Sequence, residues 1–180
     1  MPTLRINQIN EECCHFLTIT TIEWIDIFTN EDYFKLIVDS LKFCRQNKEL
    51  LLYEYVIMTN HLHLISQAKE GYKLSQIISD FKKYTTREIL KLLKNDNRRY
   101  IISLIKNSFS KKSGYENQIW QRENYPEVIE SEKFFLEKVN YIYNNPVKRG
   151  FVSKSENWLY SSARNRILND NSIIELDEWN

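Results

Sequence analysis

The hydrophobic positions of the chain recur with two different periods, one typical of strands and the other of helices. Four segments alternate in polarity or are rich in β-branched and aromatic residues, which predicts strands over residues 15–22, 50–58, 61–66 and 125–129. Three further segments repeat their apolar residues at helical spacing, which predicts helices over residues 30–46, 74–93 and 131–145. The order of elements is therefore strand, helix, strand, strand, helix, strand, helix.

Capping and turn residues mark several boundaries between these elements. Asn30 is a good N-cap for the first helix, and Thr59 with Asn60 suits a tight hairpin between the second and third strands. Pro126 cannot donate a ladder hydrogen bond, so we expect the fourth strand at an edge of the sheet. The last helix is expected to end before Pro146, because the residue before a proline resists the helical conformation.

This order of elements matches the split βαβ, or ferredoxin-like, pattern. We therefore predict an α+β domain, in which an antiparallel sheet has its helices packed on one face and is followed by a C-terminal extension. The length of 180 residues fits one such domain. Because this fold hosts many activities, the function has to be argued from individual residues.

The composition excludes several broad classes of protein. Hydrophobic residues make up 42% of the chain and aromatic residues 13%, which is enough for a packed core. Only three Gly and three Pro occur, which excludes collagen-like and low-complexity chains, and three Cys do not make a disulfide framework. We find neither an apolar run of the roughly 18 residues that a membrane span needs nor a signal-peptide core. We therefore expect a cytoplasmic protein without a membrane segment.

Positive charge is concentrated in residues 81–112, although the whole chain has a net charge of only +1. This stretch holds ten Lys and Arg residues against two acidic ones. Lys82, Lys83 and Arg87 lie on or near the predicted second long helix and are candidates for contacts with nucleic-acid phosphates. A solvated helix face explains the same charges equally well.

Two of the three histidines, His61 and His63, are separated by one apolar residue on a predicted strand. Alternate side chains of a strand share one face, so both imidazoles should project together while Leu62 points to the other side. Two imidazoles on one face are good ligands for a divalent metal ion. Two half-buried histidines, each satisfied by a hydrogen bond, remain the alternative.

The predicted last helix carries Tyr141 and Asn145, which lie on one helix face because they are four residues apart. A phenol and an amide oxygen on this face can meet the two-histidine strand across a helix–sheet interface. Such a set suits a metal that polarises a phosphodiester while the tyrosine attacks it. Tyr143 is the rival nucleophile and should point elsewhere if Tyr141 points inward. Alternatively, Tyr141 is a core aromatic residue and Asn145 caps the helix before the proline.

Several segments of the chain resemble one family of DNA-processing proteins. The run YVIMTNHLHLI (Tyr55–Ile65) resembles the HUH motif of single-tyrosine transposases. Residues 119–152, followed by 157–165, closely resemble REP-associated tyrosine transposases and their relatives, and the resemblance also includes residues 16–28 and 81–89. Thr59 stands where many relatives have proline, which affects the turn more than the chemistry. We expect residues 1–166 to form the transposase domain and residues 167–180 a C-terminal tail.

The resemblance implies an activity and a set of site residues. Members of the family cut and rejoin single-stranded DNA beside hairpins, and a tyrosine becomes covalently linked to a 5′-phosphate. They use Mg²⁺ or Mn²⁺ held by the two histidines and a third polar ligand. Carried over to this chain, His61, His63 and Asn145 would be the metal ligands and Tyr141 the nucleophile. No nucleotide cofactor is expected, because transesterification conserves bond energy and the chain has no phosphate-binding glycine loop.

The same resemblance implies hairpin-bearing single-stranded DNA as the partner of a monomer or homodimer. Lys148 and Arg149 follow the tyrosine helix, and we expect them to hold the phosphates of the cleaved strand. Two other classes stay open from the sequence. One is a non-catalytic, domesticated nucleic-acid-binding protein, and the other is a metal-dependent hydrolase in which Tyr141 is structural. A covalent bond between tyrosine and DNA would separate the transposase from both.

Overall fold

The computed structural model describes residues 11–110 and 118–179. Every predicted strand and helix is present, with ends that differ by a few residues. The strands are β1 (His15–Thr20), β2 (Leu50–Ile57), β3 (His61–Ala68) and β4 (Glu127–Val128). The helices are α1 (Glu31–Asn47), α2 (Leu74–Asn95), α3 (Arg99–Ser110), α4 (Glu132–Lys148) and α5 (Ala163–Leu168), with short 3-10 helices η2 (Ile22–Trp24) and η3 (Ser155–Asn157). None of the helices in the described ranges is long and apolar enough to cross a membrane.

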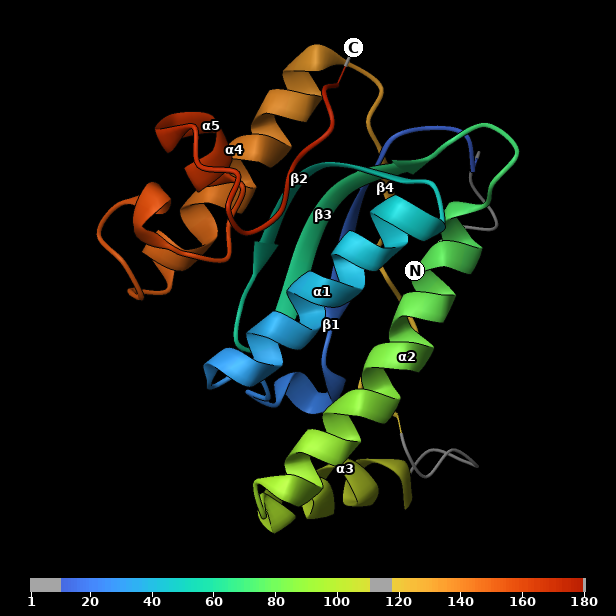
Figure 1. Ribbon diagram of the computed structural model, residues 1–180, viewed down its shortest axis with the longest axis vertical. Helices are drawn as coiled ribbons and strands as arrows, with labels where there is room; N and C mark the ends of the chain where they lie inside the picture. Colours follow the sequence, from blue (N-terminus) through green and yellow to red (C-terminus); the bar gives the residue numbers. More distant parts are fainter. Residues whose placement is uncertain (1–10, 111–117, 180) are drawn as a thin grey trace.

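The four strands form one antiparallel sheet in the order β2-β3-β1-β4 (Figure 1). This order confirms the predicted α+β, ferredoxin-like class. β2 and β3 form the expected hairpin, in which the amide of Met58 donates a hydrogen bond to the carbonyl of His61 (2.8 Å). β4 lies at the sheet edge, as the proline beside it predicts. β3 and β1 are therefore the central strands, and both faces of each must be covered.

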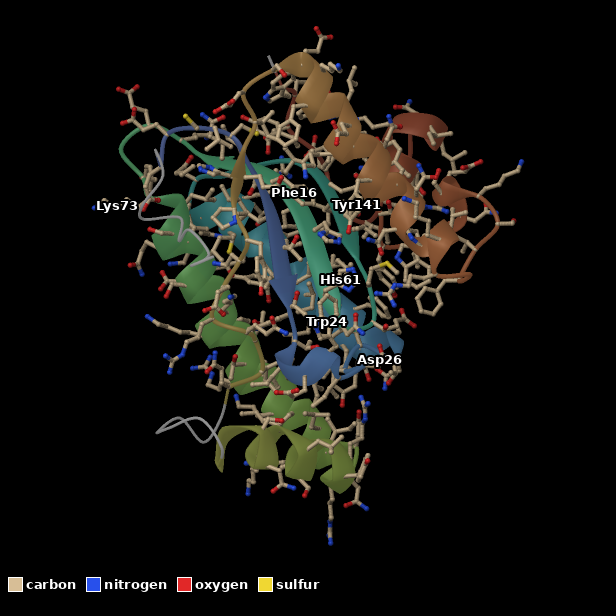
Figure 2. The ribbon with its side chains drawn as sticks, turned by 180° about the vertical axis from the view of Figure 1, so that it is seen from behind. Phe16, Trp24, Asp26, His61, Lys73 and Tyr141 are labelled. Atoms are coloured by element: carbon tan, nitrogen blue, oxygen red, sulfur yellow. The ribbon has the colours of Figure 1, made fainter. Side chains whose placement is uncertain are left out.

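Helices cover both faces of the sheet (Figures 1 and 2). On one face, Leu17, Leu62 and other inward residues form a core with α1 and α2. On the opposite face, Phe16 and Ile65 form a second core with Ile142 and other residues of α4. The prediction that all helices pack on one face is therefore corrected for α4. Both alternating sets of residues on β1 and β3 include large apolar side chains, so each face of the sheet needs a cover of its own.

The ends of the helices show which local signals decide the structure. The side chain of Asn30 accepts a hydrogen bond from the amide of Asp32 (3.1 Å), so the predicted N-cap of α1 is confirmed. The predicted end of α4 before Pro146 is wrong, because the helix continues to Lys148. Asn145 and Pro146 are both buried, and this packing outweighs the local preference of the residue before proline. Lys148 therefore belongs to the helix that carries Tyr141, and Arg149 is the C-cap of this helix.

Two helices occur where no regular element was predicted. α3 forms in the basic stretch, where it buries Ile105 and packs against α2 and η2. α5 lies just before the C-terminal segment. This segment, residues 169–179, buries Ile174 and runs beside β2. Its Asp177 accepts a hydrogen bond from the amide of Leu52 (2.8 Å) and forms a salt bridge with Arg45 (3.0 Å). The predicted tail thus packs against the edge of the sheet.

Candidate functional site

His61 and His63 lie at the start of β3 on the face that α4 covers. Their neighbours across the sheet are Thr20 and Thr18 of β1, with His61 opposite Thr20 and His63 opposite Thr18. The two imidazole centroids are 4.8 Å apart, and each residue is only 3% exposed. The one-residue spacing on a strand therefore brings both rings together, as the sequence predicts.

Hydrogen bonds fix which nitrogen of each imidazole faces the site. The side-chain amide nitrogen of Asn60 donates to the carbonyl of Trp24 (3.1 Å), so its oxygen is left to accept from Nδ1 of His61 (2.7 Å). Nδ1 of His63 lies 3.0 Å from the hydroxyl oxygen of Thr18. Nε2 of His63 is buried without a hydrogen-bond partner among the described residues. In both rings Nε2 is therefore the atom available to a ligand.

Both imidazoles are neutral near pH 7. Burial and the nearby charge of Arg149 lower the pKa of His61 from 6.5 to about 4. Burial and the neighbouring His61 hold the pKa of His63 well below its ordinary value. Neutral imidazoles keep the lone pairs that metal coordination requires.

Tyr141 and Asn145 of α4 face the histidines, one helical turn apart. The ring of Tyr141 contacts the rings of His63 and Phe16 edge to face, at centroid distances of 5.0 Å and 5.8 Å. Tyr141 is nevertheless 45% exposed, so a ligand can reach its side chain from solvent. Asn145 is 9% exposed, and its Oδ1 is a second buried atom without a partner in the described part of the chain.

These side chains line one open pocket with a volume of about 220 Å³. Figure 2 shows His61 and Tyr141 on the side of the sheet that α4 covers, with Trp24 next to His61. The lining residues come from β1, η2, β3 and the second half of α4: Thr18, Trp24, His61, His63, Tyr141, Asn145, Lys148 and Arg149. The volume is below the roughly 300–1,000 Å³ of sites that enclose a whole small molecule. An open cleft of this size suits part of a polymer.

The two tyrosines of α4 have different surroundings. The hydroxyl of Tyr143 donates a hydrogen bond to the carboxylate of Glu54 on β2 (3.1 Å), and Glu54 also accepts one from Arg166 (3.2 Å). Burial and the negative charge of Glu54 raise the pKa of Tyr143. Tyr143 therefore holds α4 against the sheet, whereas Tyr141 lies beside the histidines.

The polar atoms of the pocket fit a divalent metal ion. The structure groups no three His, Cys, Asp or Glu side chains into a metal-binding cluster within its described residues. Asn145 adds an amide oxygen beside the two imidazoles. Nε2 of His63 and Oδ1 of Asn145 are buried without a hydrogen-bond partner among the described residues, so both atoms are free to bind a ligand beside His61. Two imidazoles and one amide oxygen leave coordination positions open for substrate oxygens.

The predicted DNA-binding residues fall into two groups. Lys148 and Arg149 line the pocket, and the ammonium nitrogen of Lys148 is 5.9 Å from the centre of the Tyr141 ring. The three predicted cations on α2, Lys82, Lys83 and Arg87, lie across the sheet from the pocket. Lys82 donates to the carbonyl of Gln121 (2.7 Å), and burial lowers its pKa to about 8. The other two are exposed: Lys83 and Arg87. Their contact with DNA stays a prediction.

Sequence reasoning did not assign roles to three residues of the site. Thr18 and Asn60 orient the two imidazoles, and Trp24 forms part of the pocket wall. The position of Asn60 directly before His61 was a usable signal, because asparagine at a strand end often bonds to neighbouring polar groups. Nothing in the sequence pattern marks Trp24, because its orientation depends on an unusual backbone conformation.

A ferredoxin-like sheet with a histidine pair on its central strand, faced by a tyrosine and an amide from one helix, defines an HUH-type single-tyrosine protein. The family of IS200-like transposases matches residues 11–113, more than half of the chain. The chain belongs to this family. The matched region contains both histidines and ends before Tyr141.

Individual relatives agree with this assignment. A Haemophilus influenzae protein described as a REP-associated tyrosine transposase is 31% identical over 107 residues, which cover 59% of this chain and 54% of that protein. The REP-associated tyrosine transposase of Escherichia coli is 38% identical over 58 residues, covering 32% of this chain and 34% of that protein. These matches thus span about half and a third of the relatives' lengths.

A solved structure of a REP-associated tyrosine transposase bound to a REP hairpin has a similar fold. The TM-score is 0.64 with 21% sequence identity, and the alignment covers 95% of this chain and 87% of that structure. Unlike the family match, this alignment extends over nearly the whole chain. At this identity the comparison shows a shared fold.

Proposed function

We propose that this protein is a metal-dependent DNA strand transferase that cuts and rejoins single-stranded DNA beside a hairpin. The observation that carries the proposal is the meeting of Tyr141 with two unpaired buried atoms, Nε2 of His63 and Oδ1 of Asn145, in one open pocket. Membership of the IS200-like family and the hairpin named for the solved relative support the choice of substrate.

In the proposed step, the phenol oxygen of Tyr141 attacks a backbone phosphorus and forms a new O–P bond. The bond from phosphorus to the 3′-oxygen of the preceding nucleotide breaks, and that oxygen leaves as a 3′-hydroxyl with the proton that the phenol gives up. The DNA on the other side stays attached to Tyr141 through its 5′-phosphate. Attack by another 3′-hydroxyl reverses the step and rejoins the strand. One phosphodiester replaces another throughout, so no nucleotide cofactor is needed.

A neutral phenol is a weak nucleophile, so the phosphate has to be made more electrophilic. Mg²⁺ or Mn²⁺ held by His61, His63 and Asn145 would supply that polarisation. Asn60 and Thr18 support these roles, since they keep Nε2 of each imidazole directed at the site.

Lys148 and Arg149 are proposed to hold the phosphates next to the one that is attacked. Lys148 ends α4 and Arg149 is its C-cap, and both are exposed and line the pocket with Tyr141. Cations so close to the nucleophile position the strand without reading its sequence. We place the protein in the cytoplasm, where it would act on DNA as a monomer or homodimer.

The proposal is tested with labelled DNA hairpins that carry single-stranded extensions, incubated with the protein and Mn²⁺. A covalent protein–DNA species that survives denaturing electrophoresis is expected from the wild type and not after chelation by EDTA. His61→Ala and His63→Ala should remove this species while DNA binding, measured by fluorescence anisotropy, stays within about threefold, since affinity comes mainly from cation–phosphate contacts. DNA binding by the wild type without any adduct would instead identify a non-catalytic binding protein.

A further inference from the structure

Trp24 is an exposed aromatic residue at the rim of the pocket that the proposed chemistry does not use. Its side chain is 51% exposed, and its indole ring contacts the edge of the His61 ring at a centroid distance of 5.7 Å. Figure 2 places it beside His61, on the same side of the sheet as Tyr141. A large apolar ring is thus left in water next to the residues that we assign to catalysis.

The backbone holds Trp24 in this position at a conformational cost. Glu23 and Trp24 have φ angles of 50° and 56°, in the left-handed region that bulky residues avoid. Three hydrogen bonds keep the turn in place: the amide of Trp24 to the carbonyl of Thr21 (3.2 Å), the amide of Ile25 to the carbonyl of Ile22 (3.1 Å), and the side chain of Asn60 to the carbonyl of Trp24 (3.1 Å). Strain that the surrounding structure enforces is typical of functional sites.

We propose that Trp24 is the stacking platform for one unpaired nucleobase of the DNA strand, next to the phosphate that Tyr141 attacks. This inference rests on the proposed function. Every base has a π face, so an exposed indole binds an unpaired base without selecting its identity. The ligand of this subsite is therefore a single nucleobase in an unpaired strand, and a base held in a duplex stack would not fit over the ring.

Asn60 connects the proposed platform to the histidine pair. Its amide nitrogen donates to the backbone carbonyl of Trp24, while its oxygen accepts from Nδ1 of His61. A base seated on Trp24 is thereby held in a fixed relation to His61 and, across the pocket, to Tyr141. We infer that stacking sets which phosphate of the strand reaches the tyrosine.

Other exposed aromatic residues are poorer candidates for this role. Tyr84 lies on α2, across the sheet from the pocket, and Arg87 covers its ring at 5.4 Å. Tyr100 is more exposed than Trp24 but lies on α3 and does not line the pocket. Of the large hydrophobic side chains that are exposed in the described ranges, the pocket includes Trp24 and Tyr141. Tyr100 is thus a matched control for loss of an exposed ring elsewhere.

The test combines a Trp24→Ala variant with a series of hairpin DNAs that each lack one base in the single-stranded extension. Affinity is measured by anisotropy in the presence of Ca²⁺, and the adduct yield in Mn²⁺. We expect Trp24→Ala to weaken binding of intact DNA by roughly 5- to 100-fold, the usual effect of losing one stacked base. One abasic position should weaken wild-type binding by the same factor and cause no further loss in Trp24→Ala. Tyr100→Ala should bind like the wild type.

Two additional variants separate stacking from a structural role. Trp24→Phe keeps a smaller ring and should recover most of the affinity. Trp24→Gly suits the left-handed backbone, so it should unfold at or above the wild-type temperature and still bind as weakly as Trp24→Ala. The proposal is overturned if Trp24→Ala binds intact DNA as tightly as the wild type does. It is also overturned if the affinity lost in Trp24→Ala adds to the affinity lost at every abasic position. Because the binding cycle does not require cleavage, absence of any adduct would refute the proposed function and leave the stacking result to stand on its own.

Discussion

Acidification of the metal-free protein is expected to destabilise the fold through the buried histidines. The pKa of His61 lies at about 4 in the folded protein, against 6.5 for an unperturbed histidine. The unfolded chain takes up a proton near pH 6.5, whereas folded His61 stays neutral until about pH 4. The contribution of neutral, buried His61 to the free energy of unfolding is therefore complete above pH 6.5 and is lost as the pH falls towards 4.

The size of the effect follows from the lowered pKa. At about 1.4 kcal/mol for each pKa unit, the difference between 6.5 and about 4 corresponds to about 3 kcal/mol of unfolding free energy. His63 and His15 also have lowered pKa values, so they act in the same direction. Glu54 acts in the opposite direction, because burial raises the pKa of its carboxyl group.

The assay is urea unfolding of the EDTA-treated protein at a series of pH values, with His61→Gln as the matched variant that cannot titrate. The wild type should lose about 3 kcal/mol more than His61→Gln between pH 7 and pH 4. Subtracting the variant removes the contributions of the other groups. Parallel stability curves for the two proteins would refute the assignment of a buried, neutral His61.

Three further results are expected from the remaining parts of the site. Asn60→Ala should weaken Mn²⁺ binding, measured by calorimetry, by roughly 10- to 100-fold, because His61 loses the acceptor that orients its ring. Joint replacement of Lys148 and Arg149 by Ala should lower DNA affinity and flatten the plot of log affinity against log salt by about two, one for each lost phosphate contact. An unchanged slope would show that these cations face solvent. A variant with Ala in place of both Lys83 and Arg87, which lie across the sheet from the pocket, should form the adduct at the wild-type rate when DNA is saturating. A slower rate in this variant would contradict the placement of the active site.

The core of the site could be predicted because it depends on local periodicity. His61 and His63 share a face through the two-residue repeat of a strand, and Tyr141 and Asn145 share one through the repeat of a helix. The order of strands and helices, and with it the ferredoxin-like class, follows from the same two periods. The structure then separates Tyr141 from Tyr143 as the spacing predicts, although which tyrosine reacts with DNA is still a prediction.

The features that sequence reasoning missed depend on contacts between distant segments. α4 continues through Pro146 because that residue is buried in the fold. α3 forms in a polar stretch because its Ile105 is buried in the core. Lys82 looks like a free cation in the sequence, yet it is bound to backbone carbonyls that lie far along the chain. The orientation of Trp24 depends on Asn60, which is distant in sequence and adjacent only in the folded protein.

The most direct test of the account is to identify the residue that becomes attached to DNA. Protein incubated with a hairpin DNA and Mn²⁺ is denatured and digested with trypsin and nuclease, and the nucleotide-bearing peptide is sequenced by mass spectrometry. We predict a 5′-phosphate linked to Tyr141, loss of the adduct in Tyr141→Phe, and its retention in Tyr143→Phe, which gives up only a hydrogen bond to Glu54. Attachment at Tyr143, or an adduct that persists in Tyr141→Phe, would contradict the central claim.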